Sequence, residues 1–214
     1  MRKISLLSFA AVVFALLTAA APDPAHAYAE RTLSQMSPSE KIGQLIIARA
    51  PAGTEISAEF EGLLTDYKPG GFCLFQQNVA SAAQVRKLTE DLQERSAIPL
   101  FIAIDEEGGR VSRLNKLYEE EIPAAYKLAQ SGADAVFEAY KTIGERLFSL
   151  GVNVDFAPVA DIWSNDANRV IGDRAFAKDA ETVSEMVEAA LRGLDETPGV
   201  LSVIKHFPGH GDTA

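Results

Sequence analysis

The chain has 214 residues and a formal net charge of −10 at pH 7. This acidity argues against a nucleic-acid partner, which would require a basic face. A hydrophobic fraction of 47% describes a globular chain rather than a disordered one, and the single cysteine, Cys73, excludes a disulfide within the chain.

The first 27 residues predict a secretory signal peptide. Arg2 and Lys3 precede an apolar stretch over residues 4–21, and Ala25-His26-Ala27 supplies the small residues of a cleavage site. We expect cleavage before Tyr28 and an exported protein that is periplasmic, cell-wall-associated or extracellular. The alternative is an uncleaved membrane anchor, for which the stretch is short and its far end is helix-breaking. After cleavage no stable membrane anchor is expected.

Short apolar runs alternate with helical patterns along the rest of the chain. We predict strands at residues 44–48, 71–75, 99–104, 152–159 and 200–205. We predict helices at residues 57–67, 81–95, 133–150 and 182–194, after a short helical segment that starts near Ser37. Strands that alternate with helices of this length are typical of βαβ units and a parallel sheet.

Polar residues gather after the third, fourth and fifth predicted strands, at residues 105–113, 161–174 and 205–212. A barrel builds its site from many such loops, whereas a doubly wound sheet concentrates it in one crevice. Three consecutive polar loops favour the barrel. The predicted fold is α/β, a (β/α)8 TIM barrel truncated after about the fifth strand, with residues 28–214 as its N-terminal part. Such a partial barrel would leave an unpaired sheet edge and an uncovered core.

The loop after the fifth strand is the densest in titratable groups. It holds one cation, two imidazoles and one carboxylate between Lys205 and Asp212, which suggests an active-site rim. His206 and His210 have the spacing of a metal pair on a helix, but Pro208-Gly209 between them prevents that helix. The loop could instead carry a dinucleotide fingerprint that starts at Gly209, or form a structural turn with solvated histidines.

The loops after the third and fourth strands offer carboxylates and arginines. Asp105 follows a buried strand, where it can accept paired hydrogen bonds from vicinal sugar hydroxyls or chelate a cation. We expect the Gly108-Gly109 turn to bring Arg110 and Arg113 back beside the acids. Alternatively these charges form salt bridges that close the loop, and one of the three acids at 105–107 is expected to do only that.

Four residues of the 153–174 region receive separate interpretations. Asp161 is expected to end the fourth strand, and the rigid fork of Arg174 suits recognition of several hydroxyls. Asp155 lies within a strand and is expected to support the structure, for which it needs a partner. Trp163 either stacks on a sugar or caps the rim of the barrel.

Six stretches together resemble the glycoside hydrolase family 3 β-N-acetylhexosaminidases. They cover residues 36–45, 70–75, 104–110, 153–161, 170–176 and 205–213. The last, Lys205-His-Phe-Pro-Gly-His-Gly-Asp-Thr213, is the most specific, because it separates the hexosaminidase branch from the β-glucosidase branch. The resemblance covers essentially all of residues 28–214, in order.

The resemblance implies a (β/α)8 barrel that hydrolyses terminal, non-reducing β-linked N-acetylglucosamine with retention. Peptidoglycan fragments or chitin oligomers would be the natural substrates, and neither a cofactor nor a metal is implied. It also implies that five residues bind the sugar in the −1 subsite: Asp105, Arg113, Arg174, Lys205 and His206.

The family's catalytic groups do not match any residue of this chain. The acid/base is a histidine in an Asp-Ser-His that follows the Lys-His-Phe-Pro-Gly-His motif, and the nucleophile is a later aspartate, so both would fall beyond Ala214. We therefore expect no catalytic residue and no hydrolysis by residues 28–214. Two different readings stay open: a metal-dependent polysaccharide deacetylase with Asp105, His206 and His210 as ligands, and a secreted sugar-binding module without enzymatic activity.

Overall fold

The computed structural model describes residues 23–213, and the chain divides into two compact units, residues 1–41 and residues 42–214. Most of the predicted signal peptide therefore lies outside the described residues. In the described part of the first unit, helix α2 (Pro24–Gln35) begins after Asp23, whose carboxylate accepts the Ala25 N–H. Pro24 starts this helix instead of breaking it, because the first helical position needs no N–H donor. No helix within residues 23–213 is long and apolar enough to cross a membrane.

Helix α3 (Pro38–Gln44) starts where the sequence predicts a helix start. The Ser37 hydroxyl accepts the Glu40 N–H at 3.3 Å, and the Glu40 carboxylate accepts the Ser37 N–H at 2.8 Å. This reciprocal pair is a capping box. The helix continues to Gln44, so the first strand starts later than the predicted residue 44.

Five parallel strands form one sheet in the order β1-β2-β3-β4-β5. They are β1 (Ile47–Arg49), β2 (Gly71–Cys73), β3 (Phe101–Ile104), β4 (Val154–Asp155) and β5 (Leu201–Ser202). Each strand pairs with the one before it in the chain. A doubly wound sheet would reverse its strand order at a switch point. The order found here has no reversal, and it confirms the predicted α/β arrangement.

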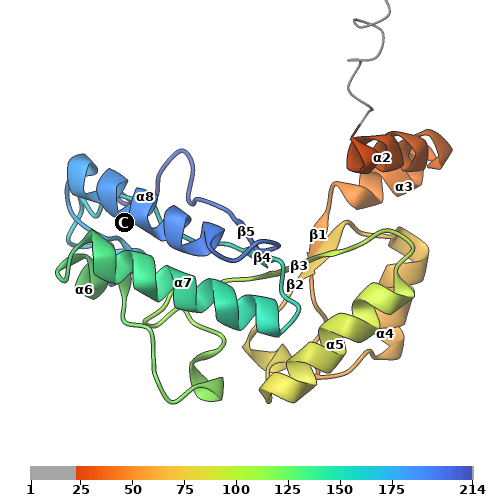
Figure 1. The fold of residues 1–214 in the computed structure, drawn as a ribbon, viewed down its shortest axis with the longest axis horizontal. Helices are drawn as coiled ribbons and strands as arrows, with labels where there is room; N and C mark the ends of the chain where they lie inside the picture. The colour runs from red at the N-terminus through yellow and green to blue at the C-terminus, as the bar shows by residue number, and fades with distance from the viewer. Residues whose placement is uncertain (1–22, 214) are drawn as a thin grey trace, which may run out of the picture. The chain divides into compact units, whose positions relative to one another are not determined.

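Helices connect the strands, as predicted, and α7 and α8 lie side by side (Figure 1). The α-helices of this unit are α4 (Ala58–Gly62), α5 (Ala82–Arg95), α6 (Ala125–Ala129), α7 (Ala133–Ser149) and α8 (Ala180–Asp195). Single turns are a π-helical one, η1 (Leu63–Tyr67), and three 3₁₀ ones, η2 (Gln76–Asn78), η3 (Asn115–Leu117) and η4 (Gly172–Arg174). Helix α6 is only five residues long and has no counterpart among the predicted helices.

The main core lies between the helices and one face of the sheet. Phe72, Ile102 and Ile104 of that face are fully buried in the same cluster as Leu92 of α5 and Tyr140 of α7. Side chains of a strand alternate between faces, so an apolar residue at every second position fills this core. The apolar face predicted for the 81–95 helix is confirmed by the buried side chains of α5.

The opposite face of the sheet is covered only in its centre. Cys73, Ala103 and Val154 form a small buried cluster there, and burial together with the nearby Asp105 raises the pKa of the Cys73 thiol to about 11. Phe101 and Leu201, which the strand register places on the same face, are exposed to 44% and 56%. Within residues 23–213, β1 and β5 pair on one side only. The expected open edges and uncovered apolar surface are thus present in the described part of the chain.

Candidate functional site

A cavity of about 400 Å³ lies at the carboxyl ends of the strands. Asp105 directly follows β3, and Lys205, three residues beyond β5, pairs with Val159 through an isolated parallel bridge. The parallel strands therefore deliver loops that are far apart in sequence to one edge of the sheet. The residues that line the cavity are Asp105, Glu107, Val111, Arg113, Phe156, Arg174, Val203, Lys205 and His206. All five predicted sugar-binding residues are among them, although their role as ligands of a sugar stays a prediction.

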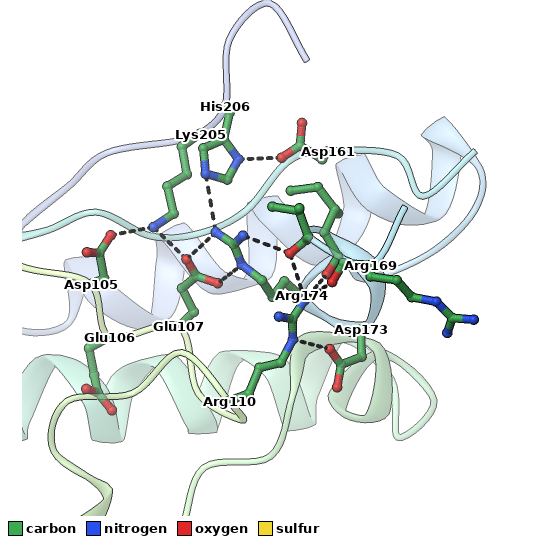
Figure 2. A network of polar contacts seen from close by, with 12 residues as sticks. Asp105, Glu106, Glu107, Arg110, Asp161, Arg169, Asp173, Arg174, Lys205 and His206 are labelled. Atoms are coloured by element: carbon green, nitrogen blue, oxygen red, sulfur yellow. Dashed lines mark hydrogen bonds and ion pairs between the residues drawn. The ribbon is translucent and has the colours of Figure 1, made fainter. Parts of the chain in front are cut away.

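The ammonium group of Lys205 bridges two carboxylates (Figure 2). Its Nζ lies 2.7 Å from Oδ1 of Asp105 and 2.6 Å from Oε1 of Glu107. The second oxygen of Asp105 lies 3.4 Å from Nη2 of Arg113. Burial opposes ionisation of Asp105, but Lys205 and Arg113 outweigh it and lower the pKa of this carboxyl. Asp105 is therefore an ionised hydrogen-bond acceptor at the cavity wall.

Glu107 holds the guanidinium of Arg174 in a two-pronged ion pair. Arg174 Nε donates to Oε2 at 2.8 Å, and Nη2 donates to Oε1 at 2.9 Å. The hydrogen bonds that Arg174 donates to Glu107 raise the pKa of Arg174. Glu107 is 2% exposed, so both charges of this pair are withdrawn from solvent. Glu107 is not among the predicted sugar-binding residues, because nothing in the motif distinguishes it from its neighbour Glu106.

Glu106 is the acid that closes its own loop. One of its oxygens accepts the hydroxyl of Ser112, and the other accepts the backbone N–H groups of Arg113 and Leu114 at 2.8 and 3.1 Å. Burial raises the pKa of Glu106 despite these hydrogen bonds. Its side chain points away from the network that joins Glu107 to Lys205 (Figure 2). The expectation that one of the three acids serves only the loop is met by this residue.

The predicted position of Arg110 beside the acids is wrong. Its Nε lies 2.9 Å from Oδ1 of Asp173, and its Nη2 donates to the carbonyl oxygens of residues 169–171 (Figure 2). Gly108 and Gly109 both have positive φ, at 84° and 55°, and turn the chain as expected. After that turn Arg110 faces the 169–173 loop, where one carboxylate and three carbonyls satisfy it. Arg113, by contrast, does return to Asp105.

His206 is fixed between an acid and a cation. Its Nδ1 lies 2.6 Å from Oδ2 of Asp161, and its Nε2 lies 3.3 Å from Nη2 of Arg174 (Figure 2). A guanidinium can only donate, so Nε2 accepts and the ring proton lies on Nδ1, toward Asp161. The other oxygen of Asp161 accepts the backbone N–H of His210 at 2.6 Å. The sequence placed Asp161 at the end of the fourth strand, but β4 ends earlier and Asp161 orients His206 instead.

Asp155 and Trp163 support the structure around the cavity. Asp155 is fully buried, its Oδ1 accepts the Glu106 N–H at 3.0 Å, and burial raises its pKa well above the ordinary value. Asp155 thus has the hydrogen-bond partner that its expected supporting role requires. Trp163 packs edge-on against Tyr126 at 5.7 Å and lies under the ammonium of Lys178 at 4.7 Å. Trp163 does not line the cavity, which favours the interpretation that it caps the rim.

The three ligands expected of a metal-dependent deacetylase are not assembled. Both ring nitrogens of His206 have partners, and Nδ1 of His210 lies 2.6 Å from the Thr213 hydroxyl. Asp105 is held by two cations. Among residues 23–213, no group of three or more His, Cys, Asp or Glu side chains is arranged to hold a metal ion. The donor set proposed for a deacetylase therefore does not fit this geometry.

The parallel sheet and the ion-paired cavity at the carboxyl ends of its strands define a barrel-type α/β domain with a polar cavity. The chain belongs to glycosyl hydrolase family 3. Residues 38–214 match the family described as the glycosyl hydrolase family 3 N terminal domain.

Two relatives of this chain are named as β-hexosaminidases. β-Hexosaminidase A of Pseudoalteromonas piscicida is 36% identical over 213 residues, which cover 88% of this chain and 35% of the relative. β-Hexosaminidase LpqI of Mycobacterium tuberculosis is 36% identical over 177 residues, which cover 82% of this chain and 44% of the relative. This chain therefore spans well under two thirds of the length of each.

Two solved structures resemble the fold. The family 3 β-N-acetylglucosaminidase from Paenibacillus sp. FPU-7 superposes with a TM-score of 0.79 at 40% identity, covering 83% of this chain and 34% of that one. NagZ from Neisseria gonorrhoeae, in complex with N-trifluoroacetyl-D-glucosamine, superposes with a TM-score of 0.70 at 32% identity, covering 78% and 50%.

Proposed function

We propose that this chain is the sugar-binding part of an exported, retaining β-N-acetylhexosaminidase that acts on terminal, non-reducing β-linked N-acetylglucosamine. The observation that carries the proposal is the convergence of Asp105, Arg113, Arg174, Lys205 and His206 on one cavity. The names of the Paenibacillus and Neisseria relatives support the aminosugar as ligand. Peptidoglycan fragments or chitin oligomers are the proposed natural substrates.

Each side chain has a chemistry that suits one part of the sugar. Ionised Asp105 accepts from hydroxyls at the far side of the ring, while Lys205 and His206 bind the hydroxyl edge nearer the scissile bond. Arg113 and Arg174 complete the polar wall. Nε of Arg113 is buried and lacks a partner among the described residues, so it is a donor that a bound sugar can satisfy. Such a wall rejects sugars that lack the matching hydroxyls, because its own groups would stay unpaired.

The acids at the cavity are suited to binding rather than to proton transfer. A retaining glycosidase uses a general acid whose pKa is raised, together with a nucleophile. The pKa of Asp105 is lowered, and both oxygens of Glu107 are held by cations. Glu106 has a raised pKa but points away from the cavity network. We propose that the residues described here bind the sugar and supply neither catalytic group.

Binding of N-trifluoroacetyl-D-glucosamine to the purified chain tests the proposal, because its fluorine signal can be followed by NMR. We expect saturable binding that Lys205→Ala and Lys205→Gln weaken by about tenfold or more, since hydrogen bonds to charged groups are the strong ones. Lys127→Ala, on the exposed face of α6, is the matched control and should bind like the parent.

Circular dichroism of each variant separates lost binding from lost folding. Absence of binding by the folded parent chain, or equal binding by the folded Lys205 variants, would contradict the sugar site. Incubation of the same protein with a chromogenic β-N-acetylglucosaminide should release no product. Hydrolysis that Lys205→Ala abolishes would show that this chain does contain catalytic groups.

A further inference from the structure

Glu107 stands at the centre of the charges around the cavity. Six charged residues surround the site, and their formal charges sum to zero when His206 is neutral. The acids are Asp105, Glu107 and Asp161, and the cations are Arg113, Arg174 and Lys205. Glu107 contacts two of the three cations, Arg174 and Lys205. A single buried carboxylate is therefore shared by two of the three cations on this wall.

We propose that Glu107 is a positioning residue that sets the charge selectivity of the site. It holds Arg174 and Lys205 in fixed places at the cavity wall and cancels enough of their charge for an uncharged sugar to be preferred over an acidic one. This inference rests on the proposed sugar-binding function and adds a determinant of which sugars are accepted.

The geometry of Glu107 leaves it little capacity for direct ligand binding, although it lines the cavity. Oε1 accepts from Arg174 Nη2 at 2.9 Å and forms an ion pair with Lys205 Nζ at 2.6 Å, and Oε2 accepts from Arg174 Nε. At 2% exposure the side chain offers almost no surface to a ligand. Asp105, at 21% side-chain exposure, is the acid that a sugar can reach. Glu107 thus acts through the two cations.

The two cations need a shared counter-charge. Because Arg174 Nη2 and Lys205 Nζ lie 2.9 and 2.6 Å from the same oxygen, Oε1, their positive groups are close together in a site that excludes much of the solvent. Without the carboxylate they would repel each other strongly. Lys205 has a flexible stem and would move, whereas Arg174 stays tied to the carbonyl oxygen of Val170. The carboxylate of an acidic sugar then supplies, from the cavity, the negative charge that these cations have lost.

Glu106 provides a matched control. It is adjacent in sequence and as buried as Glu107, at 2% exposure. Its oxygens bind Ser112 and the backbone N–H groups of Arg113 and Leu114, so it touches neither Arg174 nor Lys205. Replacing either glutamate with glutamine keeps the size of the side chain and removes one buried negative charge. Only the change at Glu107 removes a negative charge that pairs with Arg174 and Lys205 at the cavity wall.

The experiment compares N-acetylglucosamine with its C6 uronic acid, which differ by one carboxylate. Isothermal titration calorimetry gives both dissociation constants for the parent chain, Glu107→Gln and Glu106→Gln. We expect the parent to prefer the uncharged sugar, and Glu107→Gln to shift the ratio of the two constants toward the acid by at least about tenfold. Added salt should reduce this shift. Glu106→Gln should lower the melting temperature and leave the ratio within about twofold of the parent.

The outcomes separate this inference from the proposed function. If the parent binds neither sugar, the proposed function fails and the inference with it. If the parent binds N-acetylglucosamine but Glu107→Gln keeps the parental ratio, only the inference is overturned. Should Glu107→Gln not fold, Lys205→Gln tests the same balance from the other side: loss of a cation must shift the ratio further toward the uncharged sugar, and an unchanged ratio overturns the inference.

Discussion

At the scale of one residue, Asp155 shows how a buried side chain supports the loop that carries the site. It is fully buried, it accepts one hydrogen bond from the Glu106 backbone, and its Oδ2 has no partner within the described residues. Burial favours the neutral form and outweighs the hydrogen bond from the Glu106 backbone, so the pKa of Asp155 is raised well above its ordinary value of 3.8. The loop that carries Glu106 and Glu107 is thus anchored to a carboxyl that resists ionisation.

We predict that Asp155→Asn changes how stability depends on pH. A raised pKa in the folded state means that the stabilisation is fully present below the unfolded value near 4 and is lost as pH rises toward the folded value. The free energy of unfolding of the parent should therefore fall relative to Asp155→Asn as pH increases from 4, by at most about 1.4 kcal/mol per pH unit. Urea unfolding of both proteins between pH 4 and pH 8 measures this, and parallel profiles would contradict it.

The sequence predicts the site residues that belong to recognisable motifs, but not the pairing among them. Asp105 and Lys205 are separated by nearly half of the chain, and only the shared rim of the parallel strands made their proximity predictable. The roles of Glu106 and Glu107 could not be separated, because neighbouring residues of one type differ only in the direction that the loop gives their side chains. The direction in which the loop turns Arg110 was likewise not readable from the sequence.

At the scale of elements, the long helices are predictable together with their ends, whereas the strands are predictable but their ends are not. The predicted helices at 81–95 and 133–150 agree with α5 and α7 to within one residue at each end. The predicted strand at 152–159 shrinks to two residues in β4. The Val203 N–H is shared between the carbonyl oxygens of Asp155 and Ala157, and Pro158 has no N–H to continue the ladder. The length over which a strand pairs depends on the neighbouring strand, so it cannot be predicted from the segment alone.

The edge strand β5 leads to a prediction about self-association. Leu201 and Ile204 are exposed to 56% and 50% beside an edge that has no further strand among the described residues. An apolar, unpaired edge favours association with other copies of the chain. We expect the purified chain to associate increasingly with concentration, as measured by light scattering. Leu201→Lys should reduce this association, since a charged side chain on an edge strand opposes edge-to-edge pairing.

Phe148→Lys is the control for this experiment. Phe148 is exposed to a similar extent, 59%, but lies on α7 rather than on the sheet. If Phe148→Lys reduces association as much as Leu201→Lys does, general surface hydrophobicity and not the strand edge is responsible.

At the scale of the whole molecule, we predict export with removal of the first 27 residues. The prediction rests on the sequence alone, since residues 1–22 lie outside the described part. Loss of Arg2, Lys3 and Asp23 changes the net charge from −10 to −11. Expression of the full chain in a bacterial host should give a secreted or periplasmic product whose mass corresponds to a Tyr28 N-terminus. Recovery of an uncleaved chain from the cell interior would contradict this prediction.

The buried Cys73 has a practical consequence for handling the protein. With a pKa of about 11 its thiol stays protonated near neutral pH, and the thiol is a poor nucleophile compared with the thiolate. Oxidants and maleimides should therefore spare the native protein, and no reductant is needed to keep separate molecules from becoming cross-linked. Reaction of Cys73 with a thiol reagent would instead indicate that the centre of the sheet has opened to water.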